Sequence, residues 1–294
     1  MGINRVGIVG CGQMGSGIAQ VTAESGYPVI VREVDRALLD RGLALIEKNW
    51  ARAVERGKMT VEAKSQAAAN VRGTVALEDL RECGLIIEAI IEVSEEKKKL
   101  FSALDSICRP ETILASNTSS LTVIEMAMAT GRPDRVCGLH FFNPVPVMKL
   151  VEIVRTVRTS KTTIEAARDF IVSLGKEPVA AKDTSGFIVN RLLVPYLLDA
   201  IRALEAGAAS VEDMDRAMRL GCGYPMGPFT LLDYIGLDTV YFIANIMFEE
   251  FRETRYAPPP LLKRMAQAGF YGKKSGSGFY DYRGKEPQVV DLAF

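Results

Sequence analysis

Short apolar runs alternate with longer amphipathic stretches over the first 184 residues of the chain. The runs are as short as β-strands, whereas the stretches between them repeat apolar residues every three or four positions, which is typical of helices. This alternation predicts βαβ units, in which helices cover a sheet of parallel strands. The predicted strands are Val6–Val9, Val29–Val31, Leu85–Glu88, Thr112–Ala115, Val136–Leu139, Val151–Val154 and Pro178–Ala180. The predicted helices are about Met14–Ser25, Ala37–Arg56, Val61–Ala69, Ser94–Ile107 and Thr162–Leu174.

The pattern changes after Asp183-Thr184-Ser185-Gly186, because no convincing strand follows until the end of the chain. Apolar residues then repeat at helical spacing, and Ser210-Val211-Glu212-Asp213 is typical of a helix N-terminus. One apolar stripe is predicted from Phe187, Leu192, Leu193, Tyr196, Leu197 and Ile201. The 294 residues are enough for two domains. We therefore predict a doubly wound α/β domain over residues 1–184 and an all-α C-terminal domain over residues 185–294.

The composition is that of an ordinary globular protein, with 48% hydrophobic and 24% charged residues. Lys and Arg number 36, as do Asp and Glu, so no excess positive charge is available to bind nucleic acid or an anionic membrane. Even the apolar segment 234–248 contains Asp238 and Asn245, so we predict no membrane-spanning helix.

The five cysteines are an odd number and include no C-x-x-C pair, which argues against a disulfide framework and a zinc site. We predict reduced, packed thiols and no metal. The chain begins almost directly with a strand-like segment, which leaves no room for a presequence. A cytoplasmic location is therefore expected.

A glycine-rich loop, Gly10-Cys11-Gly12-Gln13-Met14-Gly15, follows a predicted strand and opens a predicted helix. In this context G-x-G-x-x-G predicts a dinucleotide site of the Rossmann type, because glycines allow a tight turn and the helix N-terminus faces the pyrophosphate. A tight turn without a ligand is the alternative. Glu33 ends the next strand, where a carboxylate would hold ribose hydroxyls and repel a 2′-phosphate. NAD is favoured over NADP, although Arg32 could weaken the preference and Asp35 could compete for the role.

The chain has one histidine, His140, at the end of the predicted strand that begins at Val136. A buried histidine that bonds a backbone carbonyl is the common outcome. Parallel strands end at one edge of a sheet, however, so His140 is expected on the same edge as Gly10. An enzyme that oxidises an alcohol needs a group to take up the hydroxyl proton, and histidine exchanges protons near neutral pH.

Glu152 lies between Val151 and Ile153 in an apolar strand, and a buried acid needs a partner. Pairing with His140 would fix the tautomer of the ring and stabilise its protonated form. A surface-facing glutamate on an alternating strand is the alternative. The polar run Asn117-Thr118-Ser119-Ser120 follows another strand, and it could supply groups to the same edge, cap a helix over residues 121–129, or do both.

Five motifs occur in order along the chain. They are Gly10-x-Gly12-x-x-Gly15, ASNTSSL at residues 115–121, HFFNPVPVMKLVE at 140–152, GFIVNR at 186–191 and KKSGSGFY at 273–280. Together they resemble the L-3-hydroxyacyl-CoA dehydrogenase family, which includes bacterial 3-hydroxybutyryl-CoA dehydrogenases. The resemblance covers essentially the whole chain, and the phrase around His140 is its most specific part.

The resemblance implies that His140 is the catalytic acid/base, with Glu152 as its partner, and that Ser119 and Asn190 hold the substrate oxygen. It implies an NAD site formed by the glycine loop, Gln13 and Met14 included, and by Glu33, Glu92, Lys97, Ser119, Asn143 and Lys274, to which we add Asn117.

Glu92, Lys97 and Lys274 rest on the resemblance alone, since their types would otherwise indicate solvated charges. The sequence departs from the family pattern at two positions. Glu33 stands where Asp is more frequent, and Ser185 replaces a frequent proline.

A row of cations, Lys48, Arg52 and Arg56, recurs every four residues and so lies on one face of the predicted helix. Such a row suits the phosphates of coenzyme A. The resemblance points to Asn49 and Arg56 in this helix, and Ser119 is expected to contact the same substrate. A solvated helix face with Glu47 and Glu55 nearby is the alternative.

Together with the resemblance, these residues predict NAD-dependent interconversion of (S)-3-hydroxyacyl-CoA and 3-oxoacyl-CoA in a cleft between the two domains. The helical domain is expected to carry a homodimer interface. An NAD-dependent dehydrogenase of a free hydroxy acid or sugar acid and a non-catalytic NAD-binding protein are the alternatives.

Overall fold

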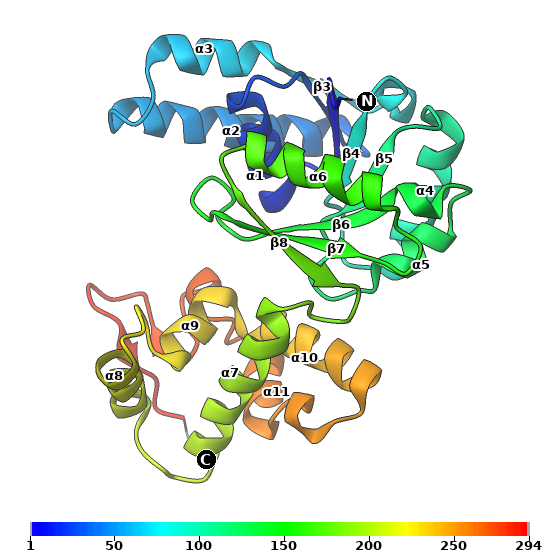
Figure 1. Ribbon diagram of the computed structural model, residues 1–294. Helices are drawn as coiled ribbons and strands as arrows, with labels where there is room; N and C mark the ends of the chain where they lie inside the picture. The colour runs from blue at the N-terminus through cyan, green and yellow to red at the C-terminus, as the bar shows by residue number, and fades with distance from the viewer. Residues whose placement is uncertain (1, 293–294) are drawn as a thin grey trace. The chain divides into compact units, whose positions relative to one another are not determined.

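The computed structural model describes residues 2–292, which fold into two compact units (Figure 1). The first unit ends at Phe187 and the second begins at Ile188, three residues beyond the boundary expected from the change of pattern. The first is a sheet with helices and the second is mainly helical, which confirms the predicted fold class.

The first unit is built on an eight-stranded sheet in the order β3-β2-β1-β4-β5-β6-β7-β8. The strands from β3 to β6 in this order are parallel, whereas β7 runs antiparallel to β6, and β8 is parallel to β7. The expectation of a parallel sheet is therefore correct for all neighbouring strands except β6 and β7, between which the direction reverses. Their bounds are β1 Val6–Val9, β2 Val29–Arg32, β3 Val71–Thr74, β4 Leu85–Glu88, β5 Ile113–Ser116, β6 Val136–Phe141, β7 Leu150–Arg155 and β8 Glu177–Lys182.

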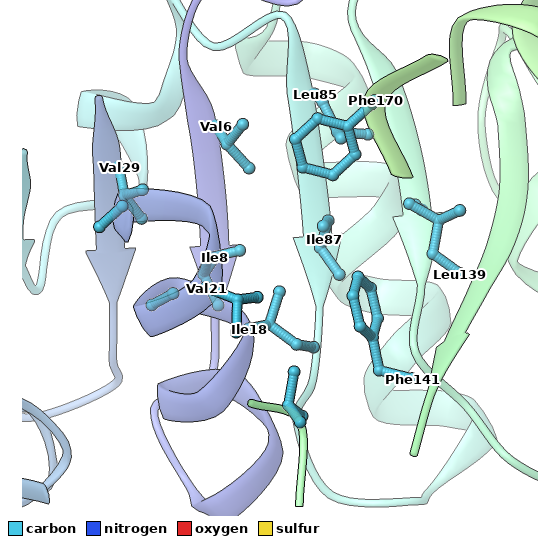
Figure 2. Close-up of a cluster of buried hydrophobic side chains, with 14 of the residues drawn as sticks. Val6, Ile8, Ile18, Val21, Val29, Leu85, Ile87, Leu139, Phe141 and Phe170 are labelled. Carbon is cyan, nitrogen blue, oxygen red and sulfur yellow. The ribbon is translucent and has the colours of Figure 1, made fainter. Parts of the chain in front are cut away.

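Helices cover both faces of this sheet (Figure 1). Successive residues of a strand point to opposite faces, so Leu85 and Ile87 of β4 join one core while Ile86 joins the other. Figure 2 shows the first of these cores, which contains Ile18 of α1 and Phe170 of α6. The helices are α1 Gln13–Glu24, α2 Arg36–Glu55, α3 Val61–Ala69, α4 Ser94–Ile107, α5 Val123–Met128 and α6 Lys161–Ser173, with 3₁₀ turns at Leu77–Leu80 and Pro133–Arg135.

Strand β3, which the hydrophobic pattern does not predict, forms one edge of the sheet. It reads Val-Arg-Gly-Thr, pairs only with β2, and has no fully buried residue. A Cβ on Gly73 would lie 2.9 Å from Leu43 and 3.1 Å from Leu39, so α2 packs where a side chain would stand. Helix α2 packs against the backbone of this edge strand at Gly73, so the strand forms without a run of apolar side chains. The hydrophobic pattern therefore does not indicate it.

The N-terminus of α5 is capped by a distant carboxylate. Asp183 accepts hydrogen bonds from Val123 N and Ile124 N, both at 2.7 Å. The polar run 117–120 was one candidate for this cap, but it does not provide it, and α5 begins later than expected. The cap ties the last residues of the first unit to the chain that follows β5.

Over its described residues, 188–292, the second unit contains five α-helices around one apolar core. Ser210 caps α8 as predicted, accepting from Asp213 N at 3.1 Å. The predicted apolar stripe is correct for Leu197 and Ile201, but Leu192 is 67% exposed and Phe187 belongs to the first unit. The elements are α7 Val189–Glu205, α8 Val211–Cys222, α9 Pro228–Ile235, α10 Leu237–Phe251 and α11 Pro260–Gln267, followed by a small hairpin of β9 Tyr280–Asp281 and β10 Gln288–Val289.

Within residues 2–292, no single helix combines the length and the apolar character that crossing a membrane requires. Helices α9 and α10 reach this length and apolar character only when they are taken together, and the chain bends by 92° between them.

Candidate active site

Four parallel strands end side by side at one edge of the sheet. In register, Val9 of β1 lies beside Glu88 of β4, Glu88 beside Ser116 of β5, and Ser116 beside Gly138 of β6. The chain order reverses between β1 and β4, which is the position where sheets of this kind bind ligands. The glycine loop, the run that begins at Asn117 and the end of β6 therefore meet at this edge.

The glycine loop has the shape that a dinucleotide pyrophosphate requires. Gly10 has φ +93°, a conformation that disfavours other residues. A Cβ on Gly15 would lie 1.8 Å from the Gly10 carbonyl oxygen, whereas a Cβ on Gly12 would meet no atom within 4 Å. Gly10 and Gly15 thus make the turn, and Gly12 leaves an open approach to the N-terminus of α1. The loop fits the pyrophosphate.

The Glu33 carboxylate is held against this loop. Its Oε1 accepts from Cys11 N at 2.6 Å and its Oε2 from Val34 N at 3.0 Å. Asp35 instead caps α2 by accepting from Leu38 N at 2.8 Å, so of the two carboxylates it is Glu33 that lies against the glycine loop. Beside the loop, Gln13 Nε2 donates to Asn143 Oδ1 at 3.0 Å, which joins α1 to the chain that follows β6.

His140 and Glu152 form a buried pair. The antiparallel register of β6 and β7 places them directly opposite each other, and His140 Nδ1 lies 2.6 Å from Glu152 Oε2. His140 is 6% exposed and Glu152 is fully buried. The structure thus brings together the two residues that the sequence nominated, and Glu152 is not the surface glutamate of the alternative.

Two aromatic rings flank this imidazole. The ring centroid of Phe142 lies 4.4 Å from that of His140, and the centroid of Phe187 lies 5.6 Å from it. Phe187 is buried and has φ +45°, which is unusual for an aromatic residue. The rings limit the access of water to the His140–Glu152 pair.

Asn117 and its neighbours hold the end of β6. Asn117 Oδ1 accepts from Phe141 N at 2.9 Å, so the residue after His140 is fixed by the loop that follows β5. Ser119 belongs to the same loop and is partly exposed. Its backbone N donates to Glu92 Oε1 at 3.1 Å.

Glu92 and Lys97 belong to a buried charge cluster rather than to a solvated surface. Lys97 is 1% exposed, and its Nζ lies 2.5 Å from Glu88 Oε1 and 3.1 Å from Glu92 Oε2. Burial opposes ionisation of Glu92, but the Lys97 ammonium and the hydroxyls of Thr118 and Ser120 hold the pKa of this carboxyl below its usual range. Glu88 was missed in the sequence, although an acid at the end of the apolar run Leu85–Ile87 carries the same signal as Glu152.

The remaining nominated residues lie elsewhere in the chain. Asn190 is on α7 and Lys274 is near the C-terminus, where its Nζ lies 2.6 Å from Asp238.

The cations Lys48 and Arg52 lie on α2 and Arg56 directly follows it, and all three are exposed. Of the neighbouring acids, Glu47 pairs with Lys64, and in residues 2–292 no carboxylate pairs with these three cations. Asn49 donates to Gln20 at 3.1 Å. Within the same residues, no group of three or more His, Cys, Asp or Glu side chains is arranged to hold a metal ion.

Comparison with known proteins identifies the family of the chain. Residues 5–184 match the model of the 3-hydroxyacyl-CoA dehydrogenase NAD binding domain, and residues 186–282 match that of the C-terminal domain. The chain belongs to the 3-hydroxyacyl-CoA dehydrogenase family. The glycine loop therefore belongs to an NAD-binding domain, and its dinucleotide is NAD.

Relatives are similar along almost the full length of the chain. A protein of Mycobacterium tuberculosis named 3-hydroxybutyryl-CoA dehydrogenase is 51% identical over 95% of this chain and 99% of its own. The human mitochondrial hydroxyacyl-coenzyme A dehydrogenase is 47% identical over 96% of this chain and 92% of its own. A crystal structure of (S)-3-hydroxybutyryl-CoA dehydrogenase from Ralstonia eutropha superposes with a TM-score of 0.92 at 40% identity, covering 96% of this chain and 100% of that one.

The open approach at Gly12 generates a test of the cofactor site. A methyl group in the Gly12→Ala variant meets no protein atom, so we expect an unchanged melting temperature. The same methyl group would stand where the pyrophosphate approaches, so the Kd of NADH should rise by at least about tenfold. Fluorescence titration of NADH measures this change. Gly84→Ala, where the added Cβ meets only ordinary contacts, is the matched control, and equal affinities in the two variants would contradict the assignment.

Proposed function

We propose that this family member interconverts (S)-3-hydroxyacyl-CoA and 3-oxoacyl-CoA, with NAD as the hydride carrier. The buried His140–Glu152 pair, at the sheet edge that also carries the glycine loop, is the observation that supports this most strongly. When bound, NAD takes up or returns the hydride at C3. The protein's own residues then have to exchange the hydroxyl proton and stabilise the oxygen.

His140 is suited to the proton exchange. Glu152 binds Nδ1, which keeps the proton of the neutral ring on Nδ1 and leaves the lone pair on Nε2. Nε2 takes the hydroxyl proton when the alcohol is oxidised and gives it back when the ketone is reduced. Glu152 also stabilises the imidazolium that forms during oxidation.

The substrate oxygen at C3 acquires negative charge as its proton leaves, and polar donors aimed at it lower the barrier. We assign this role to Ser119 and to Asn190, the second residue of α7. The names of the relatives suggest acetoacetyl-CoA as the first substrate to test. For the cofactor we assign contacts to the glycine loop with Gln13 and Met14, and to Glu33, Glu92, Lys97, Asn117, Ser119, Asn143 and Lys274.

The first test is reduction of acetoacetyl-CoA, followed by the fall in NADH absorbance. The wild-type protein should catalyse it, and a wild-type protein that leaves NADH unchanged would contradict the proposed function. In the His140→Gln variant, kcat should fall by roughly 10²- to 10⁴-fold because the ketone oxygen loses its proton donor. The Kd of NADH should stay unchanged, and near-normal kcat would remove His140 from the mechanism.

The exposed cations Lys48, Arg52 and Arg56 are proposed to contact the phosphates of coenzyme A, with Asn49 and Ser119 as further contacts. The double substitution Arg52→Glu with Arg56→Glu reverses two charges and should raise KM for acetoacetyl-CoA about tenfold or more at low salt, with kcat little changed. Arg168→Glu, at an exposed position of α6, is the matched control. An unchanged KM would show that this helix face is only solvated and does not contact the substrate.

The second unit is proposed to carry a homodimer interface. It exposes large apolar side chains, among them Leu192, Leu220 and Phe242, at 67%, 80% and 45%. Light scattering should therefore give a particle of twice the chain mass of 32.2 kDa. A particle of one chain mass at micromolar concentration would contradict this assignment.

A cytoplasmic location is also part of the proposal. It is supported by the free thiols of the cysteines, four of which are buried, since such thiols are typical of a reducing compartment.

A further inference from the structure

The segment from Ser116 to Ser120 alternates between buried and partly exposed residues. Ser116, Thr118 and Ser120 are at most 1% exposed, whereas Asn117 and Ser119 reach the surface. Three hydroxyl side chains are therefore turned into the protein, which is unusual for residues that could bond water instead. Whatever accepts these hydroxyls also decides which way Asn117 and Ser119 point.

Two carboxylates accept the three hydroxyls. Ser116 Oγ donates to Glu88 Oε2 at 2.7 Å, and Ser120 Oγ donates to Glu92 Oε1 at 3.0 Å. The Thr118 hydroxyl donates to the same Glu92 oxygen, which also accepts from Ser119 N at 3.1 Å. Ser116, Thr118, Ser119 and Ser120 thus bond directly to one of the two carboxylates, and Asn117 N donates to the backbone carbonyl of Glu88 at 2.8 Å.

One cation holds the two carboxylates together. Lys97 Nζ lies between Glu88 and Glu92 at 2.5 and 3.1 Å, and Ile90 N donates to Glu88 Oε1 at 2.7 Å. Without this ammonium, the buried Glu88 carboxylate and the partly buried Glu92 carboxylate would repel each other and lack a counter-charge, which is destabilising. The position of Glu92, and with it the position of Ser119, depends on Lys97.

We propose that Glu88, Lys97 and Glu92 act as positioning residues for catalysis, by drawing Ser116, Thr118 and Ser120 inward and so presenting Asn117 and Ser119 at the reacting edge. The inference rests on the proposed function in one respect, the contact of Ser119 with the substrate oxygen. It goes beyond the proposed contact of Glu92 and Lys97 with NAD, because it gives these residues a second effect, on the loop. Glu88, the innermost residue of the three, has no place in a cofactor contact.

The Lys97→Met variant tests the cluster. It leaves two carboxylates facing each other, so Glu92 should withdraw and release the loop. Hydrogen exchange should then accelerate at the amides of residues 118–121, whose protection depends on Glu92, Ser116 and Thr118. A displaced Ser119 should lower kcat for acetoacetyl-CoA by roughly 10- to 100-fold at saturating NADH.

A compensating substitution separates this effect from general damage. Lys97→Met combined with Glu88→Gln keeps the net charge of the cluster at the wild-type value, since one cation and one anion are removed together. The double variant should recover slow exchange in residues 118–121 and most of the lost kcat. Adding Ser119→Ala should abolish the difference in kcat between Lys97→Met and the double variant, because the cluster acts through Ser119.

Arg132→Met is the matched control. Arg132 is a partly buried cation that pairs with Asp105 at 2.5 Å, outside the 116–121 segment. It should lower the melting temperature without changing exchange in residues 118–121. If Lys97→Met does no more than this control, or if kcat falls at saturating NADH while the loop stays protected, the proposal is wrong.

Two further results keep the test decisive. If Lys97→Met does not fold, Glu92→Ala, which removes the acceptor of the Thr118 and Ser120 hydroxyls, should still accelerate exchange at Ser119, whose amide bonds to Glu92 Oε1, and unchanged exchange there would overturn the proposal. If the wild-type protein does not reduce acetoacetyl-CoA, the proposed function fails. Hydrogen exchange at residues 118–121 does not depend on activity, so it still tests whether the cluster holds the loop.

Discussion

Burial of carboxylates at the strands is the constraint on which the site depends. A buried carboxylate is stable only when a cation or several donors face it, so each such acid fixes whatever satisfies it. Glu33, after β2, fixes the glycine loop through Cys11 N. Glu88, at the end of β4, fixes Lys97, and Glu152, in β7, fixes the ring of His140. The partly buried Glu33, just after β2, and the buried Glu88 and Glu152, within β4 and β7, thus hold the cofactor loop, the Ser119 loop and the proposed acid/base in place.

Those parts of the site that depend on local sequence could be predicted. The glycine loop is defined by its own glycines and by the strand and helix on either side of it, and the structure has the turn at Gly10 that this pattern implies. Glu152 could be nominated because a charged residue inside an apolar strand is costly without a partner, and one histidine was available. The same rule applied to Glu88 would have predicted a buried counter-charge, and Lys97 lies nine residues further along.

Contacts between residues far apart in the sequence could not be predicted in this way. Asp183 caps α5 from 60 residues away, and nothing in the sequence near Val123 indicates it. Strand β3 is set by the packing of α2 over Gly73 rather than by its own residues. The type of Lys97 suggests a solvated side chain, and only the sheet, by bringing Glu88 and the loop after β5 together, makes its burial favourable.

The reversal of β7 is the step that makes the His140–Glu152 pair possible. A parallel connection between neighbouring strands needs a dozen or more residues, usually with a helix, and only residues 142–149 separate β6 from β7. The short connection therefore forces β7 to run antiparallel to β6. Antiparallel neighbours place residues directly opposite each other. Glu152, near the start of β7, therefore lies across from His140, near the end of β6. The length of this loop, together with the two side chains, determines the geometry of the proposed acid/base.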